Sequence, residues 1–76
     1  MQPISRSLKR IRETHNISQR KLAIRSGVER SYISQLEAGK AKGITILMAV
    51  RLAKGFGLSP LEFIGLLLED ESGFIE

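Results

Sequence analysis

The segment Gln19–Leu36, with the sequence QRKLAIRSGVERSYISQL, decides the fold of this 76-residue chain. Its spacing predicts a helix over about residues 19–26 and a second helix from residue 29 or 30 to residue 38. Gly27 lies between them and can adopt the left-handed backbone conformation that turns a chain sharply. Ala23 is small, as a close crossing of the two helices requires. Two short helices joined by such a turn form a helix-turn-helix, whose second helix commonly enters the major groove of DNA.

Three more helices are predicted around this unit. The apolar stripe of the first helix recurs at intervals of four and three residues, at Ile4, Leu8, Ile11 and His15. Thr45 is a suitable N-cap for a fourth helix, which we expect to end by Gly55–Gly57. The run Ser59–Glu62 has the form of a capping box with proline at the first helical position, and it predicts a fifth helix to about Glu69.

These elements predict an all-α chain, a compact five-helix bundle. We expect one domain over residues 4–69, with the helix-turn-helix at about 19–38 and a last helix at about 60–69. Residues 70–76 are expected to form a flexible tail, although Phe74 and Ile75 offer two apolar groups that could dock on the domain.

Composition excludes several classes of function. The chain has no cysteine, which excludes disulfides and thiolate metal sites and fits a reducing cytoplasm. The first residues lack the apolar core of a signal peptide, and no apolar run approaches the roughly 20 residues of a membrane span. We therefore expect a soluble, cytoplasmic protein with no membrane partner, no metal, no cofactor and no small-molecule ligand.

Charge is divided unevenly along the chain. Residues 1–40 carry nine Lys and Arg against three acidic residues, whereas residues 41–76 carry three against five. The basic half contains the predicted helix-turn-helix. A cationic surface beside such a unit attracts the phosphate backbone of DNA, although charge alone is equally compatible with other anionic partners.

Residues 8–66 resemble the Cro/repressor-type (XRE) helix-turn-helix domains of phage repressors and of restriction–modification controller proteins. The resemblance is carried by LKRIRETHNISQRKLA, the Gly27 turn, SYISQLEAGK and LAKGFGLSP, and the run ISQLEAG is its most specific part. In size and layout the chain is most similar to the controller proteins and to small phage repressors. The resemblance implies a lambda-repressor-like fold and a DNA-binding regulator of transcription.

Four polar side chains of the third helix are candidate readers of bases. With Ile33 and Leu36 directed inward, the positions that face away are Arg30, Ser31, Ser34 and Gln35. An arginine can pair with guanine O6 and N7 and a glutamine with adenine N6 and N7, while a short serine can approach bases or phosphates closely. By resemblance, family members read bases from these positions. The alternative is an ordinary solvated helix face.

Phosphate contacts are expected around the readers. Gln19 resembles the family glutamine that binds backbone phosphate, and it stands at a helix N-terminus, which itself favours anions. The further candidates are Arg20, Tyr32, Lys40 and Lys42. Arg12 and Glu37 resemble the family's ion pair between the first and third helices, so we expect them to have a structural role.

The C-terminal half has more apolar residues than one buried face needs. We predict a homodimer formed mainly through the fifth helix, with interface residues Leu61, Ile64, Leu67, Leu68, Leu47 and Met48. A two-fold dimer would bind palindromic operators, and so small a regulator suits autoregulation. The alternative is a monomer whose tail folds back over these residues.

An enzyme is not expected. His15 is the only histidine and lies on an apolar stripe, and the chain has no recognisable nucleophile–base order or phosphate-binding loop. Two other functions remain open. An antitoxin would bind DNA and also cover a toxin with its fifth helix or tail, whereas an adaptor would keep the fold without binding DNA.

Overall fold

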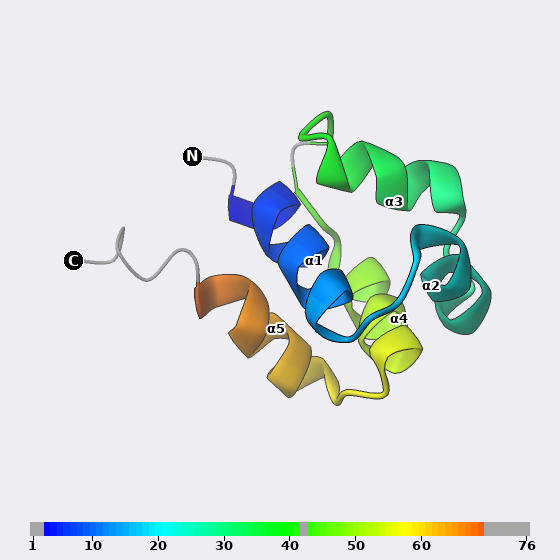
Figure 1. The fold of residues 1–76 in the computed structure, drawn as a ribbon. Coiled ribbons are helices and arrows are strands. Elements are labelled where there is room, and N and C mark those ends of the chain that lie inside the picture. Colours follow the sequence, from blue (N-terminus) through cyan, green and yellow to red (C-terminus); the bar gives the residue numbers. More distant parts are fainter. Residues whose placement is uncertain (1–2, 42, 70–76) are drawn as a thin grey trace.

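The computed structural model describes the backbone of residues 3–41 and 43–69, and the side chains from residue 6 onward within those ranges. Their secondary structure is five α-helices and no strand, as predicted (Figure 1). The helices are α1 (Pro3–Thr14), α2 (Gln19–Ser26), α3 (Arg30–Glu37), α4 (Ile46–Phe56) and α5 (Pro60–Glu69). Within the described ranges, no helix is long and apolar enough to cross a membrane. The predicted tail, with Phe74 and Ile75, lies outside the described residues.

Local signals explain where the helices begin and end. The Ser18 hydroxyl accepts a hydrogen bond from the Lys21 amide at 3.0 Å, and Thr45 caps α4 in the same way. At α5, the Ser59 amide donates to Glu62 and the Glu62 amide donates to the Ser59 hydroxyl, so the predicted capping box is confirmed. Gly27 has φ 74°, the left-handed turn that the sequence predicted between α2 and α3.

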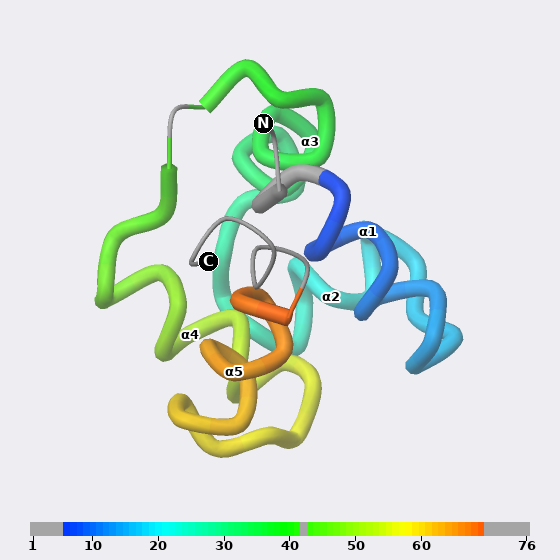
Figure 2. The backbone as a smooth tube through the Cα atoms, turned by 90° about the vertical axis from the view of Figure 1, so that its left-hand side faces the viewer, coloured from blue at the N-terminus to red at the C-terminus, as the bar shows by residue number. Residues whose placement is uncertain are grey.

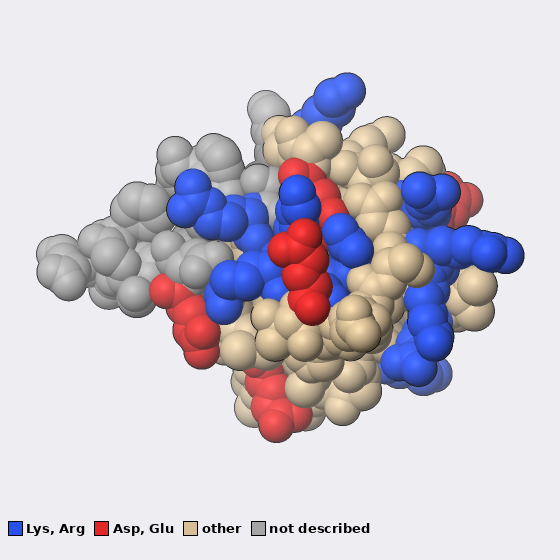
Figure 3. All heavy atoms as spheres, in the orientation of Figure 1, with Lys and Arg blue, Asp and Glu red and all other residues tan. Residues whose placement is uncertain are grey.

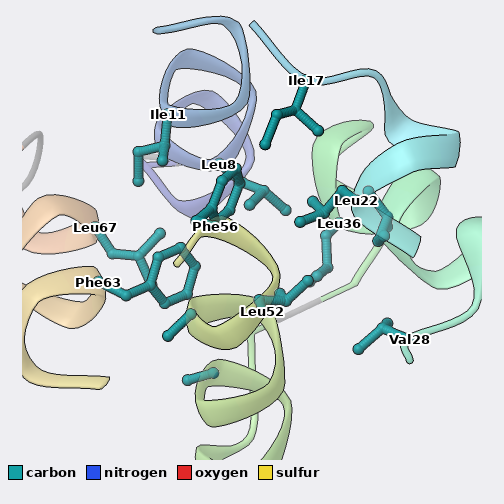
Figure 4. Close-up of a cluster of buried hydrophobic side chains, with 13 residues drawn as sticks. Leu8, Ile11, Ile17, Leu22, Val28, Leu36, Leu52, Phe56, Phe63 and Leu67 are labelled. Atoms are coloured by element: carbon teal, nitrogen blue, oxygen red, sulfur yellow. The ribbon is translucent and has the colours of Figure 1, made fainter. Parts of the chain in front are cut away.

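The helices enclose one core (Figure 4). α2 packs on α3 and α4, α1 packs on α3 and α5, and α5 also packs on α4. The largest fully buried apolar side chains come from all five helices and are Leu8, Leu22, Ile33, Leu36, Leu52 and Phe63. The Phe56 and Phe63 rings stack with centroids 5.7 Å apart, and the half-buried His15 ring lies 5.2 Å from Phe56. His15 is therefore a packed residue at the edge of the core, as expected.

The fourth helix ends between Gly55 and Gly57, as predicted, because α4 runs to Phe56 and is capped by Gly57. Gly55 itself lies in the last turn of α4, is buried, and faces α2 at close range. A Cβ atom added there would lie 2.9 Å from Leu22 Cδ1 and 2.9 Å from Ser26 Cβ. The C-cap of α4 is Gly57, two residues after Gly55, and its φ is 76°. Gly55 is thus a packing residue, and Gly57 has the predicted terminating role.

A polar clamp ties α1 to α3. Arg12 Nε donates to Glu37 Oε2 at 2.7 Å, Arg12 Nη2 donates to Glu37 Oε1 at 3.0 Å, and Arg12 Nη1 donates to the Ile17 carbonyl. The Gln19 amide nitrogen also donates to Glu37, at 3.0 Å. The Arg12 and Glu37 side chains are only 14% and 6% exposed. The predicted ion pair therefore exists, and it joins α1, the following loop, α2 and α3.

We expect Gly55→Ala to destabilise the fold by about 1–2 kcal/mol, because overpacking α2 against α4 outweighs the better helix propensity of alanine. The control is Gly65→Ala in α5, where an added Cβ would meet nothing within 4 Å in one copy of the chain. That change should stabilise the helix by about 0.5–1 kcal/mol. Urea denaturation of both variants measures the two effects. Equal changes in the same direction would contradict the close crossing.

We expect Glu37→Gln to cost about 2–4 kcal/mol of unfolding free energy, because it leaves the Arg12 guanidinium largely buried without its counter-charge. The control is Glu69→Gln, whose pair with Arg10 spans 3.9 Å between side chains that are 60% and 43% exposed. Its cost should be below about 1 kcal/mol. Chemical denaturation at neutral pH compares the two, and a similar small cost for both would show that the clamp adds little.

Candidate nucleic-acid interface

α3 separates an apolar face from a polar one. Ile33 and Leu36 are buried in the core. The four predicted readers are all exposed on the other side of the helix: Arg30, Ser31, Ser34 and Gln35. The structure thus brings these four side chains together, with two long hydrogen-bonding groups and two short hydroxyls on one surface. The helix α3 itself lies near the top of the molecule in Figure 1.

Both ends of α3 are held firmly. Before its first residue, Val28 is buried and its amide donates to the Ser26 hydroxyl at 3.1 Å. At its last residue, Glu37 is held by the Arg12 clamp. A helix of eight residues is marginal on its own in water, so its position depends on these anchors and on the core. The exposed polar face of α3 is therefore presented in one fixed orientation.

Gln19 has a more constrained place than the sequence indicated. Its side chain is half-buried, and one amide N–H donates to Glu37. Because a carboxylate accepts hydrogen bonds and does not donate them, this contact settles which end of the amide faces Glu37. The second amide N–H remains to donate to a phosphate at the N-terminus of α2. Its predicted phosphate contact stays a prediction.

The other residues predicted to contact phosphate differ in how exposed their side chains are. Arg20 and Lys40 are exposed, whereas Tyr32 is half-buried and packs against the core. Lys42 lies outside the described residues. The two exposed cations flank α3 in sequence, one in α2 and the other just after α3.

α2 has an exposed cationic surface with no acidic residue of its own. Arg20, Lys21 and Arg25 are exposed there. In Figure 3 the Lys and Arg side chains gather along the right-hand edge of the molecule, where Figure 1 draws α2. Acidic side chains in that view are prominent along the lower left, over α5. The hydrogen bond to Glu37, opposed in part by burial, raises the pKa of Arg12, so this guanidinium is charged at neutral pH.

A second surface is apolar. It is formed by the exposed side chains of α4 and α5, which we call the apolar ridge: Ile46, Leu47, Val50, Leu61 and Leu68. Ile46 and Leu61 are 80% and 83% exposed. Between the two helices lies a groove of about 210 Å³ whose walls include Ile44, Ala49 and Ile64.

The ridge differs from the interface that the sequence predicted. Leu61, Leu68 and Leu47 are exposed as expected, while Ile64 and Met48 are half-buried. Leu67 was expected at the interface but is only 5% exposed, and its carbonyl accepts a hydrogen bond from the buried Ser7 hydroxyl. It belongs to the monomer core.

Sequence reasoning also missed two ridge residues. Ile46 and Val50 lie one helical turn apart, at i and i+4, on the exposed face of α4. That spacing is visible in the sequence, although the residues predicted for the interface were the neighbouring Leu47 and Met48. Which apolar stripe of α4 faces the core depends on its contacts with α2 and α5, which no single-helix pattern reveals.

The comparisons agree with this architecture. A family model described as helix-turn-helix, HTH_3, matches residues 8–63. No curated protein sequence matches the chain. Among solved structures, the wild-type restriction–modification controller protein C.Esp1396I is 28% identical, with a TM-score of 0.78 over 92% of this chain and 88% of that one.

Two further structures extend the similarity. A mutant of C.Esp1396I in a trigonal crystal form is 30% identical, with a TM-score of 0.78 over 93% of each chain. The controller protein C.AhdI from Aeromonas hydrophila is 28% identical, with a TM-score of 0.70 over 80% of this chain and 91% of that one. The family match, the similar structures and the exposed polar face of α3 lead to one conclusion: the chain belongs to the HTH_3 family of helix-turn-helix proteins and is a DNA-binding transcriptional regulator.

Proposed function

We propose that this regulator acts as a homodimer on palindromic operators and controls its own gene, as a restriction–modification controller or a small repressor would. The observation that carries the proposal is α3, which buries its apolar face completely and exposes four polar side chains beside a cationic α2. The controller proteins with similar structures support the first of these two circuits.

The two long side chains of α3 would make the main hydrogen bonds to bases. Arg30 can donate two hydrogen bonds to guanine, and Gln35 can both donate to and accept from adenine. Each such bidentate contact is worth about 1–3 kcal/mol of discrimination against a wrong base. Ser31 and Ser34 leave room for the helix to lie deep in the groove. Arg20, Lys40 and the second Gln19 N–H would fix the register on the phosphates.

The apolar ridge supports a second copy of this chain as its cover. A monomer rarely exposes so many large apolar side chains on two adjoining helices. A ridge beside a groove is also self-complementary under a two-fold rotation, because the ridge of each copy can occupy the groove of the other. Figures 1 and 2 both draw α3 well above α5, so covering the ridge would leave the reading face open.

The two-fold symmetry of the proposed dimer determines how the half-sites of its operator would be arranged. A two-fold dimer presents its reading helices about 34 Å apart on one face of the duplex. Each copy would then read an equivalent half-site, and the half-sites would be centred about 10 base pairs apart. Binding as a dimer also makes occupancy rise steeply with protein concentration. Such a response suits a gene that regulates itself.

Selection of bound duplexes from a random DNA pool should recover a symmetric motif. The double variant Arg30→Ala, Gln35→Ala should lose that motif, with at least about 30-fold weaker binding to the selected site, because two bidentate contacts are removed. The charge-matched control is Lys54→Ala, which removes an exposed cation from α4 and should retain the motif.

The selection is run at two salt concentrations, since phosphate contacts weaken steeply with salt whereas a base motif persists. Weak binding without a motif would contradict the proposal. It would favour the alternative function, an antitoxin whose apolar ridge covers a toxin.

We expect Ile46→Glu to convert the dimer to a monomer, because it places a charge in the centre of an apolar interface. The matched control is Ile24→Glu on α2, which changes a side chain of similar exposure, 72% against 80%, away from the ridge. Sedimentation equilibrium of wild type and both variants measures the association. A dimer that survives Ile46→Glu, or a wild type that is monomeric at all concentrations, would contradict this interface.

A further inference from the structure

We propose that Glu29, the residue just before α3, selects the base pair beside the Arg30 contact by accepting a hydrogen bond from the exocyclic amine of cytosine. This inference rests on the proposed function, and it adds a reader of opposite charge to the four polar side chains already described. It also names the base that this reader would choose.

The first observation is how α3 begins. α2, α4 and α5 start at Ser18, Thr45 and Ser59, and each of these hydroxyls accepts a hydrogen bond from an amide of the helix. The N-cap of α3 is Glu29, which makes no side-chain capping hydrogen bond. Glutamate is not among the residues favoured at an N-cap, so this position is not optimised for the stability of α3.

The second observation is that Glu29 is exposed yet held in place. Its backbone is extended, with φ −63° and ψ 140°, and its carbonyl accepts hydrogen bonds from the Tyr32 and Ile33 amides. Val28 on its N-terminal side is buried, and Ile33 is fully buried. The backbone of Glu29 is therefore fixed at the leading end of α3, where helix-turn-helix proteins contact base edges, and its exposed side chain borders a hollow that Tyr32 and Arg51 also line.

The negative charge of Glu29 restricts the groups that it can contact on DNA. A carboxylate at this position cannot contact phosphate, since both groups are anionic and neither donates a hydrogen bond. In the major groove, the base edges also present acceptors, except at the amines of cytosine and adenine. Cytosine N4 is a donor without a neighbouring acceptor on its own base, whereas the adenine amine lies beside N7. Cytosine is therefore the base that a glutamate accommodates best.

Three variants test the assignment in the random-pool selection. The wild type should select a C·G pair at one position of each half-site. Glu29→Gln should change that position to A·T, because glutamine pairs with adenine N6 and N7, and should leave the other positions unchanged. Glu29→Ser should lose the preference there by about tenfold or more while raising the thermal stability of the protein, since serine is a good N-cap.

The third variant, Glu13→Gln, is the charge-matched control. It neutralises an exposed acidic residue of α1 and should keep the C·G preference.

The outcomes separate this inference from the proposed function. A wild-type motif that keeps C·G in both Glu29 variants, with affinity changed equally on all sequences, would overturn the role of Glu29 and leave the proposed function intact. A wild type that selects no symmetric motif would overturn both. A change confined to one position of the half-site establishes the role.

Discussion

The crossing of α2 over α4 at Gly55 is the constraint on which the functional geometry depends. Only the absence of a side chain lets Leu22 and Ser26 approach the α4 backbone so closely. α2 leads directly into α3 through the Gly27 turn, and α4 carries half of the apolar ridge. The crossing at Gly55 therefore fixes the position of the predicted reading face relative to the proposed dimer interface. In a dimer, the distance between the two reading helices would depend on this crossing, and DNA fixes that distance at about one helical turn.

The Arg12 clamp complements this apolar contact. α3 is short, and half of its surface is polar and exposed, so the core alone holds only one of its faces. Glu37 adds a directional anchor at the end of α3 that is farthest from the Gly27 turn. Burying these charges costs desolvation, which the several hydrogen bonds of the clamp offset. The same carboxylate also orients Gln19, so one residue connects the position of α3 with a predicted phosphate contact on α2.

Much of the fold could be predicted from the sequence, because its helix boundaries are encoded locally. Hydroxyl caps and left-handed glycines act within three or four residues, and the predicted ends agree with the structure to within one or two positions. The errors concern residues whose environment is set by distant elements. The end of α4 near Gly55 and Gly57 was predicted, but the contact of Gly55 with α2 was not, and Leu67 belongs to an apolar run in which several faces are equally plausible. The face of α3 was easier, since its two inward residues leave only one polar side.

The proposed dimer is supported by the small amount of sequence that one copy could read. A single α3 exposes four predicted readers, and with about 1–3 kcal/mol for each good contact it would discriminate among only a few base pairs. A genome offers about a million or more competing sites, so one such half-site is too common to mark a single gene. Two copies held rigidly across the ridge add their discrimination, provided that their reading helices match the helical repeat of DNA. In the proposed dimer, the exposed apolar side chains of α4 and α5 would then serve specificity as much as stability.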